Sequence, residues 1–280
     1  MQLTPRYGDR PILVIDVPVA GDHPAVRQRQ RLGALLGELS EDEWQQPSRC
    51  EGWTVQDVVL HLIGTNGFWT VSVASGASGS PTELLAAFDP VATPAQLVER
   101  DRDQPAADTL AAYLASTASL AAAFDALGPD DWQRTGEAPP GHLPLTQVAD
   151  HALWDAWIHE RDIALPLSRV PAVEDDEVLV CLRYCAGLGQ AFVLASGAAH
   201  SGAVELEVTD PSARLVVEVD GGDAVRVHTG SAPQGAPRLT GDAVDVVEAL
   251  SQRVPLPDPS PASDWLAAGL AEVFDQPPGA

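Results

Sequence analysis

The chain contains no lysine, so its 16 basic residues are all arginines. They face 40 acidic residues, which gives a formal net charge of −24 at pH 7. A surface of that sign repels phosphate backbones and anionic lipid headgroups. We therefore expect neither nucleic acid nor a membrane among the partners of this protein.

Cysteine is also scarce, with three residues, Cys50, Cys181 and Cys185. A small, odd number argues against a disulfide framework and for a reducing compartment. Cys181 and Cys185 are four residues apart on an expected helix. They could form half of a metal site, but two buried thiols are the favoured interpretation.

Targeting signals are missing as well. The N-terminal segment has no charged region followed by an apolar one, as a signal peptide would. No apolar run looks long enough to span a bilayer. We therefore expect a soluble, cytoplasmic protein. A chain of 280 residues with 45% hydrophobic content is long enough for two domains, each with its own hydrophobic core.

Helical periodicity dominates the first part of the chain. Apolar residues recur at helical spacing over about 24–39, 55–73, 106–127 and 145–165. Ser40 and Thr54 begin capping-box patterns, which predict helix starts after them. The proline-rich segment 139–144 is expected to be a loop. Four substantial helices favour a four-helix bundle over residues 24–166, preceded by an N-terminal arm, 1–23.

The pattern changes after an expected linker, 167–173. A helix is expected over 175–194, followed by strands near 203–209, 214–219, 224–228 and 237–241, then helices over 242–251 and 264–274. The predicted fold class is α+β: the bundle followed by a smaller α/β domain, 174–280, with a mainly antiparallel sheet. Residues 11–17 could be a further strand or an extended arm.

Asp155 and His159 are four residues apart on the last expected bundle helix, so they stack on one face, with His151 one turn earlier. A carboxylate and an imidazole so placed can supply two ligands to a divalent cation. His61, on the helix over 55–73, is the best candidate for a third. A hydrogen-bonded pair in the core or on the helix surface is the alternative interpretation.

Two segments of the chain resemble the maleylpyruvate isomerase-like proteins of actinobacteria, a family in the DinB-like metal-binding superfamily. The first segment, RCEGWTVQDVVLHL, ends at Leu62, and the second, DAWIHERD, begins at Asp155. Segments near 239–253 and 265–275 resemble the C-terminal domain of that family. The resemblance covers roughly residues 24–275.

The resemblance implies a four-helix bundle that holds a divalent metal, usually zinc, and a smaller α/β domain. It also implies mycothiol, a low-molecular-weight thiol, as cosubstrate. Carried over by motif, the metal ligands are His61, Asp155 and His159, and Arg253 matches the arginine that follows the family's late helix. The family's usual helix acid is Glu. Asp is one methylene shorter, so with Asp155 the metal would lie nearer the helix axis or bind in a shifted geometry.

Three hypotheses about function follow. The first is a metal-dependent, thiol-using isomerase or S-transferase that acts on a small electrophile, with Arg253 available to an anionic substrate. The second is a hydrolase or lyase that uses metal-bound water, and the third is a non-catalytic binding module of the same fold. Asp162 could orient an imidazole or be a helix-surface charge, and Arg161 is expected to be an exposed charge. The chain is expected to be a monomer or a homodimer.

Overall fold

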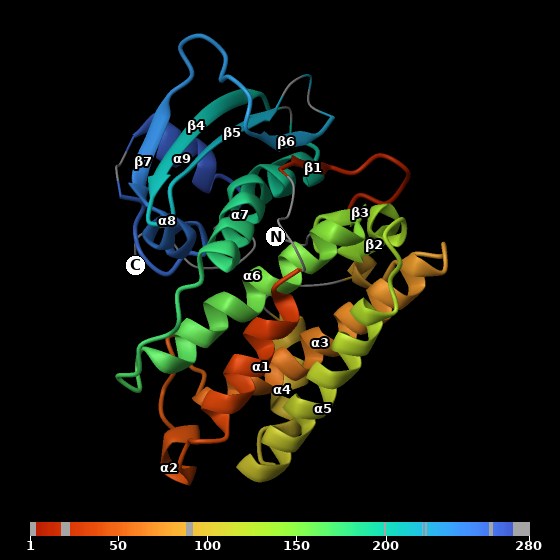
Figure 1. Cartoon of the computed structure of the whole chain (residues 1–280), viewed down its shortest axis with the longest axis vertical. Helices are drawn as coiled ribbons and strands as arrows, with labels where there is room; N and C mark the ends of the chain where they lie inside the picture. Colours follow the sequence, from red (N-terminus) through yellow and green to blue (C-terminus); the bar gives the residue numbers. More distant parts are fainter. Residues whose placement is uncertain are drawn as a thin grey trace.

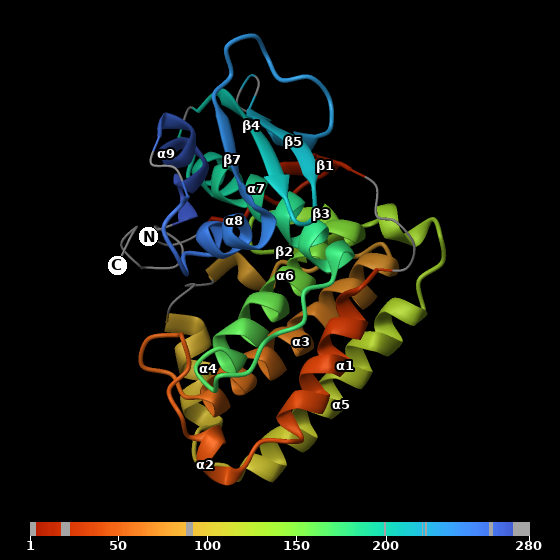
Figure 2. The ribbon, with the colours of Figure 1, turned by 60° about the vertical axis from the view of Figure 1, so that its left-hand side comes forward.

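The computed structural model describes residues 4–17, 23–87, 92–198, 200–219, 221, 223–257 and 260–270. A bundle of helices forms one end of the molecule, and a sheet with further helices forms the other (Figures 1 and 2). The helices of the first part are α1 (Ala25–Leu36), α2 (Glu41–Trp44), α3 (Val55–Ala77), α4 (Ala92–Asp101), α5 (Ala106–Asp125) and α6 (Leu145–Ala164), with 3₁₀ turns η1 (Leu84–Ala87) and η2 (Asp131–Gln133).

The predicted four-helix bundle is confirmed. Helix α3 packs against α5 and α6, and α1 packs against the same two helices, so the four helices close a ring. The short helix α4 lies against the outside of α3. Leu32, Leu62 and Tyr113 belong to an apolar cluster inside this ring, contributed by α1, α3 and α5. Helix α6 therefore faces α3 along a packed seam.

Both predicted capping boxes are present. Ser40 accepts a hydrogen bond from the backbone N–H of Glu43, whose carboxylate bonds back to the Ser40 N–H. Thr54 and Asp57 do the same at the start of α3. Asp57 also accepts from Nε of Arg102 at 3.0 Å. Hydrogen bonds to both backbone and side-chain groups therefore stabilise the first turn of α3. They fix the start of the helix and hence the positions of its later residues.

The segment 139–144 is not the expected loop. It contains β3 (Gly141–Pro144), which pairs antiparallel with β2 (Thr135–Ala138). The N-terminal segment adds to this hairpin, because the N–H of His142 donates to the carbonyl of Arg6 at 3.0 Å. Gly141 has a φ of 129°, and a Cβ there would lie 2.0 Å from the Arg6 oxygen. Strands of four residues among prolines are too short to show a period of two.

The second part of the chain consists of α7 (Asp175–Ala195), β4 (Gly202–Thr209), β5 (Ala213–Val219), β6 (Val225–His228), β7 (Arg238–Asp242), α8 (Ala243–Leu250) and α9 (Pro261–Ala267). Strand β1 (Leu13–Asp16) joins this sheet, in the order β1-β6-β5-β4-β7. The central pairs β6–β5 and β5–β4 are antiparallel, as expected, whereas both edge pairs are parallel. In place of the helix expected over 264–274, α9 begins earlier, at Pro261, and ends earlier, at Ala267. Residues 271–274 lie outside the described part of the chain.

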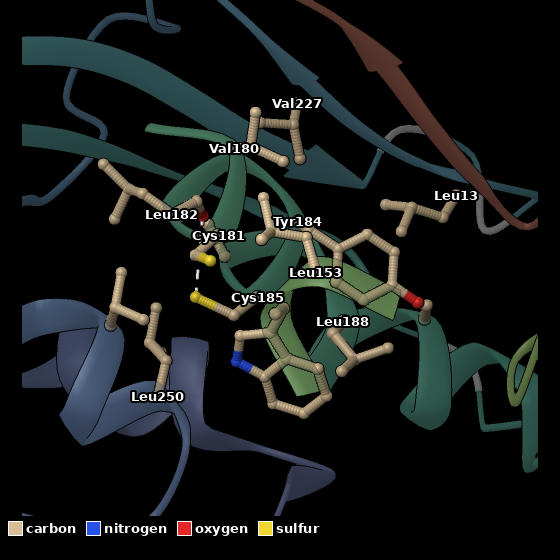
Figure 3. Close-up of a cluster of buried hydrophobic side chains, with 14 of the residues drawn as sticks. Leu13, Leu153, Val180, Cys181, Leu182, Tyr184, Cys185, Leu188, Val227 and Leu250 are labelled. Atoms are coloured by element: carbon tan, nitrogen blue, oxygen red, sulfur yellow. Dashed lines mark hydrogen bonds between the residues drawn. The ribbon is translucent and has the colours of Figure 1, made fainter. Parts of the chain in front are cut away.

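Helix α7 joins the sheet to the bundle. Figure 3 shows its buried side chains between Leu13 and Val227 of the sheet and Leu153 of α6. Cys181 and Cys185 are both free and fully buried here, as favoured from the sequence. One apolar cluster extends from the bundle through α7 into the sheet. The division into domains at 167–173 stays a prediction.

Two helices have the length and hydropathy to cross a membrane, α3 and α7, so the expectation that no apolar run is long enough was wrong. The apolar windows of α3 and α7 are 44% and 83% buried inside the protein. A helix in the core of a protein can have the same length and hydropathy as a membrane-spanning helix, because both environments favour apolar side chains. Burial within the fold accounts for the hydropathy of α7.

Candidate metal and thiol site

Three side chains from two helices converge on the seam between α3 and α6. Nε2 of His61 lies 3.5 Å from Oδ1 of Asp155, and Nε2 of His159 lies 3.6 Å from the same oxygen. The two imidazole rings meet edge to face, with centroids 4.9 Å apart. One potential ligand atom from each residue lies within 4.8 Å of the others. The structure therefore brings together the three residues singled out from the sequence, even though Asp155 is shorter than Glu.

The donor set suits a divalent cation. Oδ2 of Asp155 is buried and has no hydrogen-bond partner among the described residues. Burial would raise the pKa of Asp155, but the His61 hydrogen bond and the charge on nearby imidazoles outweigh burial and lower the pKa below its ordinary range. An ionised carboxylate and two imidazoles are ligands that zinc takes in open, catalytic sites. The residues present fit the metal that the resemblance implies.

Asp162 contacts the His159 ring at Nδ1, the nitrogen that does not face Asp155. Asp162 is fully buried, so it is not the helix-surface charge that was one of its two interpretations. Its Oδ2 lies 3.0 Å from Nδ1 of His159. A neutral His159 that donates its Nδ1–H to Asp162 presents Nε2 as a lone pair, which is the form that a metal ligand needs.

Arg253 reaches the site from the segment after α8. Its Nε and Nη2 donate to the two oxygens of Asp162, both at 2.8 Å, and its Nη1 donates to the carbonyl of Ser251 at 3.0 Å. The structure therefore places this predicted site residue beside the ligand group, but with its charge directed at Asp162. The pKa of Asp162 is held below its ordinary range, because the guanidinium of Arg253 outweighs the effect of burial.

Cys50 belongs to the site, although its role was not recognised from the sequence. Its Sγ lies 3.3 Å from Oδ2 of Asp162, 3.7 Å from Nδ1 of His159 and 3.7 Å from Nη2 of Arg253. The available signal was its position in the segment RCEGW, next to the motif that carries His61. Cys50, His159 and Asp162 form a second possible ligand group. Both oxygens of Asp162 already accept from Arg253, however, so this group suits a cation less well.

A second buried carboxylate, Glu248 of α8, pairs with two arginines. Arg49 donates to it through Nη1 at 3.0 Å, and Arg161 donates through Nε. Arg161 also lies over the ring of Trp157 at 4.8 Å, and its side chain is only 12% exposed. The expectation of an exposed Arg161 was therefore wrong. This network holds α8 against α6 and the loop that carries Cys50.

The fold and site define a class of protein, a helical bundle with a partly buried His–Asp–His group and an attached α/β part. The chain belongs to the family described as mycothiol maleylpyruvate isomerase N-terminal domain, whose model matches residues 25–164. This confirms the family resemblance.

Known relatives cover nearly the whole chain. Two uncharacterized proteins from two strains of Mycobacterium tuberculosis are 26% identical over 264 residues, which is 89% of this chain and 92% of theirs. The crystal structure of the mycothiol-dependent maleylpyruvate isomerase is similar with a TM-score of 0.60 at 15% identity, over 85% of this chain and 90% of that one. A point mutant of the same isomerase matches equally well in fold, at 14% identity.

Proposed function

We propose that this protein is a metal-dependent isomerase or S-transferase that uses a low-molecular-weight thiol, mycothiol, on a small electrophilic substrate. The observation that carries the proposal is the convergence of His61, Asp155 and His159, with an unpartnered carboxylate oxygen among them. Membership of the mycothiol maleylpyruvate isomerase family supports the choice of thiol. Zinc is the proposed metal because two imidazoles and a carboxylate are ligands that it prefers.

Each residue has a separate part in this proposal. His61, Asp155 and His159 would hold the cation. When bound, the cation supplies positive charge and Lewis acidity, which lower the pKa of a thiol so that it is a thiolate at neutral pH. Asp162 holds the His159 ring through Nδ1, which turns Nε2 toward Asp155, and Arg253 balances the buried charge of Asp162.

The proposed reaction is addition of the thiolate to an electrophilic carbon. In an isomerisation, the addition turns a carbon–carbon double bond into a single bond, rotation follows, and the thiolate leaves as the double bond forms again. In a transfer, the new carbon–sulfur bond remains and the adjacent carbon takes up a proton from water. Maleylpyruvate, named for the structurally similar isomerase, is the substrate to test first.

Metal content by mass spectrometry is the first experiment, on purified wild type, His61→Ala and Asp155→Ala. We expect about one divalent ion per chain in the wild type and loss of it in both variants. His228→Ala is the matched control, because His228 also faces a carboxylate, Glu218, at 3.4 Å but belongs to no three-ligand group among the described residues. Zinc at full stoichiometry in both site variants would contradict the ligand assignment.

Turnover then separates the candidate functions. The proposal expects conversion of maleylpyruvate by the zinc-loaded protein only when mycothiol is added. Substrate consumption without any thiol would instead favour a hydrolase or lyase that uses water. A wild type that takes up no metal even after reconstitution with zinc would favour the non-catalytic binding module.

A further inference from the structure

His151 lies one turn before Asp155 on α6, and the ligand group makes no use of it. Its ring centroid is 4.8 Å from that of Trp69 on α3 and 5.0 Å from that of Tyr184 on α7. The centroid of the Trp154 ring lies 5.3 Å from that of His151, on a third side of the imidazole. Only 6% of His151 is exposed. An imidazole is therefore fixed among aromatic rings at the junction of three helices.

The hydrogen bond to Tyr184 decides which nitrogen of His151 carries the proton. The Tyr184 hydroxyl lies 2.5 Å from Nδ1 of His151. Burial raises the pKa of Tyr184 well above its ordinary value, so Tyr184 remains a phenol with a proton to donate. That proton has no other acceptor among the described residues, and a buried O–H without an acceptor is costly. Tyr184 is therefore the donor, Nδ1 accepts, and a neutral His151 carries its proton on Nε2.

The Nε2–H of His151 has no acceptor within the described part of the chain, and this atom is not fully buried. Burial lowers the pKa of His151 to about 4, against the opposing effect of the Asp155 charge, so the ring is neutral at physiological pH. Nδ1 makes the one hydrogen bond of this ring within the described part of the chain. An N–H that still reaches solvent from an otherwise buried ring can donate to an oxygen atom of a ligand in place of water.

We infer that His151 is a further catalytic residue, whose Nε2–H donates a hydrogen bond to a carbonyl or carboxylate oxygen of the substrate. The inference rests on the proposed function, because it places the other end of the substrate at the His61, Asp155 and His159 group. Residues four apart on a helix are separated by about 5–6 Å. The matching substrate class is a short oxo acid or dicarboxylate whose oxygens are about that far apart, with its double bond between them.

A neutral donor at this position would act on the reaction itself. When a thiolate adds to a carbon–carbon double bond conjugated to a carbonyl, negative charge moves onto the carbonyl oxygen. The Nε2–H of His151 would stabilise that oxygen without giving up its proton. When the thiolate leaves, the enolate electrons re-form the carbonyl and the original double bond, and the negative charge departs on the sulfur, so the donor serves both steps.

The test uses the zinc-loaded, full-length protein and three variants. The double variant His151→Phe/Tyr184→Phe removes the imidazole and also the Tyr184 hydroxyl that bonds to it, so that no buried hydroxyl is left without an acceptor. His151→Gln keeps an N–H donor, and His228→Ala is the control far from α6. We expect the double variant to bind zinc and unfold at the wild-type urea concentration, but to lose about 10- to 100-fold in kcat/KM for maleylpyruvate with mycothiol, mainly through kcat. His151→Gln should recover part of that loss.

A binding measurement keeps this inference separate from the proposed function. In ¹⁵N-histidine-labelled protein, NMR should find the His151 proton on Nε2 between pH 6 and 8. With mycothiol left out, added fumarate, a short dicarboxylate, should shift that Nε2–H signal in the zinc-loaded protein. An unmoved signal, or a double variant within twofold of wild-type kcat/KM, would overturn the role of His151. Failure of the wild type to turn over maleylpyruvate, with the fumarate shift present, would overturn the proposed reaction alone.

Discussion

Asp162 and Arg253 form a two-point ion pair across the site. Nε of Arg253 donates to Oδ1, and Nη2 donates to Oδ2, both at 2.8 Å. Asp162 is fully buried, and the Arg253 side chain is 15% exposed. Two parallel hydrogen bonds between charged groups fix orientation as well as distance. This pair therefore fixes the segment after α8 relative to α6, on the side of His159 that faces away from Asp155.

Arg253→Ala should be strongly destabilising. It takes from the buried Asp162 carboxylate the guanidinium that meets both of its oxygens and leaves only Nε of Arg49, 3.5 Å from Oδ1, as a nearby arginine charge. Breaking a buried pair by removing one partner typically costs about 3–5 kcal/mol. Urea unfolding at pH 7 measures the change. The double variant Asp162→Leu/Arg253→Met should be much closer to wild type, because it removes both charges. If Arg253→Ala alone unfolds at the wild-type urea concentration, the pair does not hold the two segments together.

Asp162→Asn should weaken metal binding while leaving all three proposed ligands in place. Nδ1 of His159 would lose its carboxylate acceptor, and loss of such a partner typically lowers metal affinity about 10- to 100-fold. Competition with a chromophoric zinc chelator measures the affinity. Asp176→Asn is the control, because Asp176 pairs with Arg27 at the surface of the protein. Equal zinc affinity in Asp162→Asn and wild type would exclude an orienting role for Asp162.

Local signals predicted the helices and the convergence of the candidate ligands. Helical periodicity places His61 on α3 and both Asp155 and His159 on α6, and bundle packing makes these two helices neighbours. The capping box at Thr54 is contained in four consecutive residues, so it too could be recognised in advance. These features depend on spacing along the chain, which a sequence displays directly.

Contacts between distant segments could not be predicted in this way. Cys50 meets His159 109 residues later, and Arg49 meets Glu248 199 residues later. Neither pairing leaves a periodic trace. Strand β1 likewise pairs with β6 at the far end of the chain, so its partner was unknown even where a strand was considered. Burial of Asp162 and Arg161 follows from the same long-range packing.

Glu137→Gln should loosen the N-terminal segment. The Glu137 carboxylate is fully buried and accepts from the Tyr7 hydroxyl at 2.8 Å, from the Thr82 hydroxyl at 2.6 Å and from the N–H groups of Leu84 and Leu85 at 2.9 and 2.7 Å. Gln replaces one acceptor oxygen with an NH₂ group that must face donors. We expect a loss of about 2–3 kcal/mol, since hydrogen bonds to a charged group are lost and buried donors are left unpaired.

Limited proteolysis and urea unfolding test this change. Cleavage near residues 4–10 and 82–86 should become faster in Glu137→Gln. The exposed neighbour Glu83 provides the control, because Glu83→Gln changes the same charge without touching a buried donor. Identical cleavage patterns for the two variants would show that the carboxylate of Glu137 does not hold these segments.

Stability should fall below pH 6.5 because of His151. Burial lowers the pKa of His151 in the folded protein to about 4, whereas in the unfolded chain the pKa is near the ordinary histidine value of 6.5. Protonation therefore favours the unfolded chain: the contribution of His151 is fully present above pH 6.5 and is lost as the pH falls toward 4. The shift corresponds to about 3 kcal/mol at most. The charged or titratable groups near the ring are Asp155 of α6 and Tyr184 of α7, while α3 contributes Trp69.

Urea unfolding of metal-free protein at pH 7.0 and pH 5.0 isolates this contribution by comparison with His151→Phe/Tyr184→Phe. Other groups titrate in both proteins and cancel in the difference. Between the two pH values the wild type should lose about 2 kcal/mol more than the double variant, since roughly 1.5 pH units of the interval lie below the unfolded pKa. Parallel losses in the two proteins would mean that His151 is as easily protonated in the folded chain as in the unfolded one. Its Nε2–H would then not be the fixed, neutral donor that the Tyr184 contact implies.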